Sequence, residues 1–458
     1  MKLFNTLTKK VEELKPLDPP KVSVYTCGPT VYDYPHVGNW FTFIRYDLLI
    51  RTLVASGYEP KWVMNITDVG HLTSDADEGE DKLVREARKE GKTAWDVAQY
   101  YSDYFVSSLN KLNFLEPWQM PRATDHIDDQ ISLINQLQQK GFTYRISDGI
   151  YFDTSLFAEY RNFARLDLDE QLAGSRIEYN PEKKNPSDFA LWKFSPKDQK
   201  RDMEWDSPWG KGFPGWHIEC SSMCLKYLGQ TLDIHSGGID HIPVHHTNEI
   251  AQSQSITGKP LANIWMHTNH ILINDQKISK SLGNGIKLED IEARNISLEA
   301  FRLHVFESHY RSQSKFSWDS LLAAQNRLLR YKNFAIKRYQ KFNNTLFLPP
   351  PDLLTSMQDD LNTPQALVLL EQYIDNSESR PLSQDSISQT ISLIDSLFGS
   401  QLTKTEDIAD SSKVLIQKRE KARLARNWVE ADKIREILAK DNIGINDSQF
   451  GPVWYYLS

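Results

Sequence analysis

The stretch KVSVYTCGPTVYDYPHVGNWFTFIRYDLLIRTLVASGYEPKWVMNIT, residues 21–67, decides the fold. Its first residues alternate around Val22 and Val24, a period that predicts a β-strand. Asn39 can cap the helix that follows the turn-rich loop, and Gly57 can end it. The run KWVMNIT at its end is rich in β-forming residues and predicts a second strand.

Strand, helix and strand at this spacing favour a parallel sheet, whose ligands bind beyond the carboxyl ends of the strands. Here those ends are Cys27 and Thr67. Strand and helix patterns alternate again from residue 216, and from residue 288 the pattern is mainly helical. We therefore expect an α/β fold, with a Rossmann-type parallel-sheet domain interrupted by an insertion and followed by a helical C-terminal half.

Composition narrows the class of protein. The 458 residues are 40% hydrophobic and 25% charged, values typical of a globular chain of two to four domains. No apolar run is long enough to cross a membrane, and MKLFNTLTKKVEELK has no signal-peptide pattern. Three cysteines cannot all pair, so we expect a reducing, cytoplasmic location. The net charge of −8, taken over the whole chain, argues against a nucleic-acid binder.

The segment IDHIPVHHTNEIAQS, residues 239–253, carries metal-binding chemistry. On a helix His245 and Glu249 lie one turn apart on one face, which suits a divalent metal but also an ordinary surface pair. His246 points about 100° away, so the two histidines cannot serve equally. Cysteine thiolates would complete a tetrahedral site, and spacing does not choose among Cys27, Cys220 and Cys224.

Two loops have phosphate-binding features. His36-Val37-Gly38-Asn39 stands at a predicted helix start, where backbone N–H groups bind anions and Gly38 permits close approach. Lys277-Ile278-Ser279-Lys280-Ser281 offers two ammonium groups and two hydroxyls ahead of Gly283 and Gly285. Either loop alone is also what a solvated polar turn looks like.

Together these motifs resemble those of cysteinyl-tRNA synthetase, a family of class I aminoacyl-tRNA synthetases. The HVGN and KISKS motifs of this chain correspond to the HIGH and KMSKS motifs of that class. The resemblance extends from about residue 20 to 455 through YTCGPTVYDYPHVGN, NITDVG, PGWHIECSSM, LDIHSGGIDHIPVHHTNEIAQS, KISKSLGN and DDLNTPQAL. Two departures stand out: HHTNE replaces the commoner HHENE at a non-ligand position, and a longer loop follows NITD. We interpret His71 in that loop as a loop residue.

The resemblance implies one Zn²⁺, held by Cys27, Cys220, His245 and Glu249, with Cys224 and His246 in structural roles. Zinc would take the thiolate of the substrate L-cysteine as a further ligand and so select cysteine over serine, without an editing domain. The amino-acid pocket would comprise Gly28, Thr67, Trp216 and His235. ATP, with Mg²⁺, would contact His36, Gly38, Asn39, Gly237, Gly238, Asp240 and Lys280. The catalytic residues would be His36, Asn39, Lys277 and Lys280.

The resemblance also gives domain boundaries and makes tRNA(Cys) the partner of an expected monomer. We expect residues 1–114 and 216–275 to form the catalytic domain, 115–215 a connective insertion, 276–318 the KMSKS loop and stem-contact region, 319–405 a helical bundle and 406–458 a small anticodon-binding domain. Residues 411–458 carry nine Lys/Arg and six Asp/Glu, a net of +3 that leaves −11 for the rest. Charge divided in this way is compatible with an RNA partner.

For the RNA contacts we single out basic and aromatic side chains, because phosphates attract the first and unpaired bases stack on the second. They are Arg327, Arg330, Lys332, Lys337, Arg338, Lys341, Trp428 and Trp454. Six of them are basic and occur where residues 320–351 contain no acidic residue. Two other functions remain open: a zinc-dependent cysteine:amino-sugar ligase of mycothiol synthesis, and a non-catalytic zinc- and nucleotide-binding protein. The complete segment 411–458 argues against the first, and the intact HVGN and KISKS motifs argue against the second.

Overall fold

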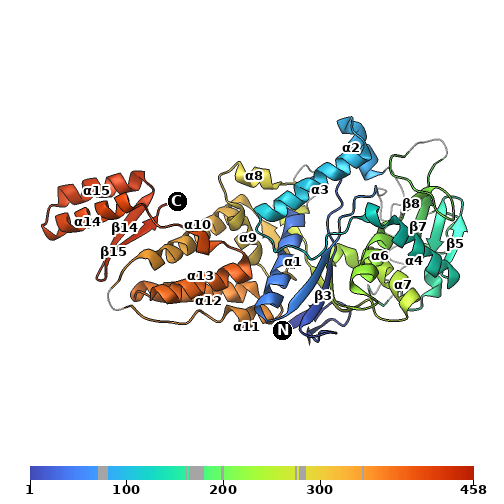
Figure 1. The fold of residues 1–458 in the computed structure, drawn as a ribbon, viewed down its shortest axis with the longest axis horizontal. Coiled ribbons are helices and arrows are strands. Elements are labelled where there is room, and N and C mark those ends of the chain that lie inside the picture. The colour runs from blue at the N-terminus through green and yellow to red at the C-terminus, as the bar shows by residue number, and fades with distance from the viewer. Residues whose placement is uncertain are drawn as a thin grey trace. The chain divides into compact units, whose positions relative to one another are not determined.

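The computed structural model describes residues 1–70, 81–160, 162–163, 180–196, 201–273, 276–277, 285–342 and 345–458, with the backbone alone at Gln276, Lys277 and Ser379. The chain divides into two compact units (Figure 1). The first comprises residues 1–272, 276–287 and 310–314, and the second comprises residues 273–275, 288–309 and 315–458. The finer domain boundaries expected from the sequence stay predictions.

The first unit is built on a four-stranded sheet of order β10-β9-β3-β4, in which every neighbouring pair is parallel. Its strands are β3 (Lys21–Thr26), β4 (Glu59–Met64), β9 (Leu232–Gly238) and β10 (Ala262–Thr268). Helix α1 (Val37–Ala55) packs against β4 and β9, and α6 (Trp216–Leu228) packs against β3 and β4; in Figure 1 they flank β3. The predicted Rossmann-type parallel sheet is thereby confirmed.

Helix α1 begins three residues earlier than the sequence indicated. His36, and not Asn39, is its N-cap: the His36 ring accepts the Asn39 backbone N–H at 3.3 Å, and the Asn39 side chain accepts the His36 N–H at 3.1 Å. This reciprocal pair satisfies two amides of the first turn. Gly57 follows the C-cap residue Ser56 with φ of 84°, a left-handed backbone suited to glycine.

The rest of the first unit surrounds this sheet. The insertion contributes an antiparallel sheet of order β5-β6-β7-β8. The elements not yet named are β1 (Lys2–Asn5), β2 (Lys10–Glu13), α2 (Lys82–Glu90), α3 (Ala94–Lys111), α4 (Ile127–Gln139), β5 (Thr143–Ile146), β6 (Gly149–Phe152), β7 (Phe189–Phe194), β8 (Gly212–Pro214), α7 (Thr247–Thr257), β11 (Ile271–Ile273) and β12 (Gln276–Lys277).

The second unit is mainly helical, as predicted. Its elements are α8 (Leu288–Glu292), α9 (Leu298–Phe306), β13 (Ser314–Phe316), α10 (Trp318–Ile336), α11 (Leu353–Gln358), α12 (Thr363–Ser379), α13 (Gln384–Phe398), α14 (Asp410–Leu424), α15 (Trp428–Lys440), β14 (Ile443–Ser448) and β15 (Gly451–Tyr456). Helices α14 and α15 and the hairpin β14–β15 share a small core around Ile416, Ile434 and Leu438. Within the described ranges no helix combines the length and apolar character needed to span a bilayer.

Candidate functional site

The four donors that the resemblance implies converge beyond the carboxyl end of β3. Cys27 directly follows that strand, and its N–H donates to Ser236 O of β9 at 3.0 Å. Cys220 projects from α6, His245 from the π-helical turn Ile242–His246, and Glu249 from α7. All four side chains are buried, and one donor atom from each lies within 4.8 Å of the others. One ion can therefore reach all four.

The contacts inside this group suit a cation. His245 Nε2 lies 2.8 Å from Glu249 Oε1, and His235 Nε2 lies 2.7 Å from Glu249 Oε2. Yet in the described part of the chain neither oxygen of this fully buried carboxylate accepts a hydrogen bond of good geometry. Buried carboxylates are ordinarily paired or coordinated to a metal. Two thiols, one imidazole and one carboxylate form a donor set that fits a metal ion.

A second donor group shares Cys27 and Glu249 with the first. It is completed by His235 and His246, again with all donor atoms within 4.8 Å of one another. His246 Nε2 lies 3.3 Å from Cys27 Sγ, so His246 reaches the same thiol that the first group contains, although the sequence led us to expect that the two histidines do not serve equally. The reason is local: residues 242–246 form a π-helical turn, so the 100° step of an α-helix does not apply there.

Protons and charges in the first group are strongly coupled. Burial raises the pKa of the Cys27 thiol well above its usual value, whereas the hydrogen bond with Cys27 lowers the pKa of Cys220 to about 7. Burial acts to lower the pKa of His245, but Glu249 and Cys220 outweigh it and raise that pKa to about 10. For Glu249, burial acts to raise the pKa. The charges of His235 and His245 outweigh burial and lower the pKa of Glu249. These shifts favour a proton on Cys27 and on His245 at neutral pH, and the Cys220 thiol loses its proton near pH 7.

Two of the predicted amino-acid pocket residues, Trp216 and His235, contact these donors. Trp216, the first residue of α6, has its ring centroid 4.5 Å from that of His245. His235 stacks on Trp265 of the neighbouring strand at 4.5 Å. Thr67 is buried, and its hydroxyl accepts from the Asn65 side chain at 3.0 Å. At Gly28 an added Cβ would stand 1.7 Å from Asn65 O, so backbone packing alone requires glycine there. Their roles toward a substrate stay predictions.

The predicted ATP residues divide into two groups. His36, Gly38 and Asn39 form the N-terminus of α1, whose backbone amides make an anion site. Gly237 and Gly238 end β9, and Asp240 follows as an exposed residue. At Gly237 a Cβ would stand 2.4 Å from the His246 ring. Lys280 and His71 lie outside the described residues, as does the side chain of Lys277.

Sequence reasoning missed three residues that line this region. His217 Nδ1 lies 3.1 Å from His245 Nδ1, behind the donor group. His267 Nε2 lies 2.7 Å from His246 Nδ1, and burial lowers the pKa of both rings and keeps them neutral. Trp265 stacks on His235. The strand WMHT carried a usable signal, because alternation places residues 265 and 267 on one face, in register with the end of β9.

The sequence led us to expect that the basic residues on and after α10 present an open phosphate-binding face. In the structure Arg327, Arg330 and Arg338 contact other groups of the protein instead. Arg327 pairs with Glu307 and with Glu371 of α12, and Arg330 pairs with Glu371 and Asp375. Arg338 donates to three backbone carbonyls at residues 402, 403 and 405. Burial lowers the pKa of Lys337. The other four of the six predicted basic residues have these partners or, in the case of Lys337, a pKa lowered by burial. Lys332 and Lys341 therefore stay our predicted contacts to RNA phosphates.

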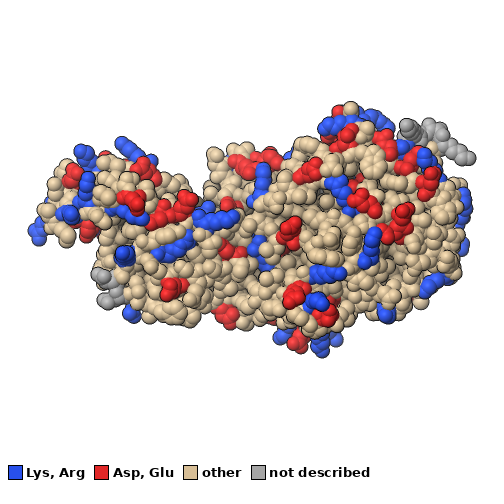
Figure 2. Space-filling model, in the orientation of Figure 1, with Lys and Arg blue, Asp and Glu red and all other residues tan. Residues whose placement is uncertain are grey.

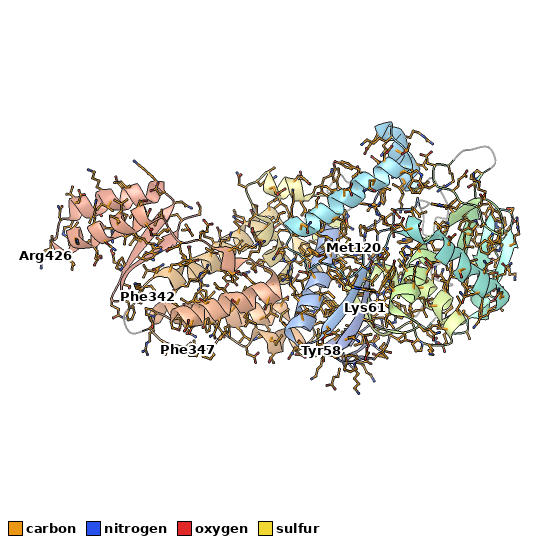
Figure 3. All side chains as sticks on the ribbon, in the orientation of Figure 1. Tyr58, Lys61, Met120, Phe342, Phe347 and Arg426 are labelled. Atoms are coloured by element: carbon orange, nitrogen blue, oxygen red, sulfur yellow. The ribbon has the colours of Figure 1, made fainter. Side chains whose placement is uncertain are left out.

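The other two predicted RNA contacts lie in the C-terminal module, Trp428 at the start of α15 in the α14–α15 hairpin and Trp454 on β15. Trp428 is 57% exposed beside Leu424 and Val429, which are 79% and 83% exposed, whereas Trp454 packs against the small core. Arg426 marks the turn between the two helices (Figure 3). Figure 2 shows blue Lys and Arg side chains along this hairpin, with red acidic ones among them. The end of the hairpin thus combines apolar surface with positive charge.

Comparison with known proteins follows this geometry. Residues 13–326 match the family model of the tRNA synthetases class I (C) catalytic domain. Cysteine–tRNA ligase 1 of Burkholderia lata is 42% identical over 466 residues, covering 98% of this chain and 95% of that protein. The chain belongs to the cysteine–tRNA ligase family. The cysteine–tRNA ligase of Treponema denticola is a further member, 39% identical over 99% of both chains.

A solved structure confirms the fold at a greater distance. Mycobacterium tuberculosis methionyl-tRNA synthetase, in complex with methionyl-adenylate, superposes with a TM-score of 0.61 at 15% identity, over 84% of this chain and 93% of that one. At this identity the likeness concerns the fold alone. Family membership confirms the resemblance drawn from the motifs, including those of the C-terminal half.

Proposed function

We propose that this chain activates L-cysteine with ATP to form cysteinyl-adenylate, and transfers the cysteinyl group to the 3′-terminal adenosine of tRNA(Cys). The buried group of two thiols, one imidazole and one carboxylate carries this proposal, because it could hold a thiol-binding ion beyond the carboxyl ends of the parallel strands, where such sheets bind their ligands. The relatives named cysteine–tRNA ligase, which align over nearly the whole chain, support it.

We assign zinc to Cys27, Cys220, His245 and Glu249, since this N/S/O set suits tetrahedral zinc. When bound, zinc supplies a thiophilic centre that holds the substrate sulfur as a thiolate. A hydroxyl is a poor ligand by comparison, and an aliphatic side chain offers no donor. Discrimination of this kind exceeds what pocket shape achieves, because one methylene is worth only about 1–3 kcal/mol.

In the first reaction a carboxylate oxygen of cysteine attacks the α-phosphorus of ATP, the bond from that phosphorus to the bridging oxygen breaks, and pyrophosphate leaves. No protein nucleophile is needed, so the chain contributes position and charge. His36 Nδ1 accepts the Asn39 N–H, which puts the proton of the neutral ring on Nε2, as a donor for a phosphate oxygen. Lys277, Lys280 and Mg²⁺ would balance the charge of the departing pyrophosphate.

In the second reaction the ribose 2′-hydroxyl of the terminal adenosine attacks the acyl carbonyl, and AMP leaves. For tRNA binding we propose that the exposed Trp428 stacks on an unpaired base while Arg426 and Lys341 attract phosphates. The cytoplasmic location and the monomeric state stay predictions.

Two measurements on the purified protein test the proposed function. Cysteine-dependent exchange of pyrophosphate into ATP is expected, followed by cysteine attachment to tRNA(Cys). Exchange without charging, but with ligation to an amino sugar, would instead support the mycothiol-type ligase. Absence of exchange would remove both enzymes and leave the non-catalytic zinc- and nucleotide-binding protein.

A further inference from the structure

The residues that directly follow the KISKS-containing segment contact the start of α1. The Val37 N–H donates to Ile286 O at 2.8 Å. Gly285 lies against His36, since a Cβ added to that glycine would stand 3.8 Å from His36 Cβ. The Lys287 ammonium lies 4.0 Å from the centroid of the Tyr34 ring, two residues ahead of His36. Residues 285–287 thus contact the loop that carries the predicted phosphate-binding motif.

Tyr34 is itself held in one orientation by α3. Its ring meets Tyr101 and Tyr104 edge to face, at centroid distances of 5.0 and 4.7 Å. Its hydroxyl lies 2.7 Å from the hydroxyl of Tyr100. Edge-to-face pairs of this kind are favourable beyond the area they bury. The ring therefore offers the Lys287 cation a fixed π face.

The upstream end of the same segment is attached to α1 as well. Arg45 is 1% exposed and donates to Asn269 O at 3.3 Å and to Ser314 Oγ at 2.7 Å. Asn269 comes immediately after β10. Helix α1 and the loop before it therefore contact both ends of residues 269–287, of which 274–275 and 278–284 lie outside the described residues.

We infer that Tyr34 and Lys287 are positioning residues, whose cation–π contact fixes the downstream end of the KISKS segment against the HVGN motif. This inference rests on the proposed function. Both motifs must act on one triphosphate, and a shift of about 1 Å in such groups can cost about 10²-fold in rate. Neither residue belongs to the two motifs, and Lys287 acts through Tyr34 and not on ATP.

Substitution of the cation tests the inference. Lys287→Met should raise the KM for ATP in pyrophosphate exchange about threefold to tenfold, the range that a partly desolvated cation–π contact supports. Lys287→Arg and Tyr34→Phe, which keep cation and ring, should restore most of the loss. Tyr34→Leu should match Lys287→Met, and the double variant should be no worse than either single one. The KM for cysteine should stay within about twofold of the wild-type value.

Lys82 and Tyr32 form a second cation–π pair, and Lys82 serves as a matched control. Lys82 Nζ stands 5.6 Å from the Tyr32 ring, outside residues 285–287, so Lys82→Met removes a similar charge without touching the proposed contact. A wild-type KM for ATP in Lys287→Met, or an equal increase in Lys82→Met, would overturn the inference. Equilibrium binding of ATP, measured in parallel, keeps the test independent of turnover. If the wild-type protein lacks exchange activity, the proposed function is wrong. The ATP dissociation constants of the variants still show whether the contact between Tyr34 and Lys287 affects ATP binding.

Discussion

His245 Nε2 lies 2.8 Å from Glu249 Oε1, across the point where a π-helical turn gives way to α7. The two residues are four apart, and the contact holds although the backbone between them is not a uniform α-helix. Both side chains consequently face Cys27 and Cys220. This relationship makes the donor group testable by single substitutions.

Cys220→Ser should lose the metal. Loss of a residue that merely orients a ligand costs about 10- to 100-fold in metal affinity, so loss of a thiolate should cost at least that. Cysteine binding should weaken far more than ATP binding. Metal content and the two dissociation constants measure the effect, with Cys224→Ser as the control, because Cys224 is equally buried but belongs to neither donor group. Equal loss of cysteine and ATP binding would point to a purely structural ion.

Metal affinity should rise with pH. The pKa of Cys27 is raised and that of His245 is raised to about 10, so both carry protons at neutral pH and must release them to bind an ion. Raising the pH weakens this competition. Between about pH 6 and 8 the logarithm of the apparent affinity should increase by about two to three per pH unit, with the third proton released by Cys220, whose pKa is about 7. Competition with a calibrated chelator measures it, and a flat profile would contradict these protonation states.

Trp428→Ala should weaken tRNA charging and spare pyrophosphate exchange. Stacking of a base on an aromatic ring is worth about 1–3 kcal/mol, which corresponds to about a 5- to 150-fold rise in the KM for tRNA. Trp428→Phe should recover most of it. Val429→Ala is the control, since Val429 is the exposed neighbour without a ring. An unchanged KM for tRNA would remove Trp428 from the interface.

Salt dependence separates two kinds of basic residue on and after α10. Lys332→Met and Lys341→Met should each reduce the slope of log affinity for tRNA against log salt by about one. Arg330→Met should leave that slope nearly unchanged and lower the thermal midpoint, because Arg330 already pairs with Glu371 and Asp375. A reduced slope in Arg330→Met alone would restore the open phosphate-binding face expected from the sequence.

Asp447 should stabilise the C-terminal module at neutral pH. Arg419, with 3% of its side chain exposed, donates to both carboxylate oxygens at 2.7 and 2.8 Å, which lowers the pKa of Asp447. A lowered carboxyl pKa adds stability above the unfolded value of about 3.9 and loses it as the pH falls through the folded value. Asp447→Asn should therefore cost about 2 kcal/mol at pH 7 and less at pH 3, which lies below the unfolded pKa. Hydrogen exchange of α14 measures it, and an equal cost at both pH values would contradict the ion pair.

The sequence predicted the parallel sheet because strand and helix periods are local patterns. The spacing of residues left open which cysteines join His245 and Glu249, and only the family resemblance named Cys27 and Cys220. Alternation located β3 within one residue, and Gly229 and Gly258 marked the ends of α6 and α7. His36 was not predicted as the N-cap of α1, because histidine is an uncommon N-cap residue and asparagine, which stands at Asn39, is a favoured one. The pairing of Arg330 with Glu371 was invisible for another reason: the acidic partners lie some forty residues away, on a helix whose packing no local pattern reports.

The separation of the donors along the chain has a consequence for synthesis. Cys27 stands before the insertion, whereas Cys220, His245 and Glu249 all stand after it. The two thiols meet only when β3 has paired with β9, and closing so long a loop is a late, non-local event. A nascent chain released only as far as the insertion holds one donor of four. An ion held by all four residues would therefore require that β3 and β9 have already paired.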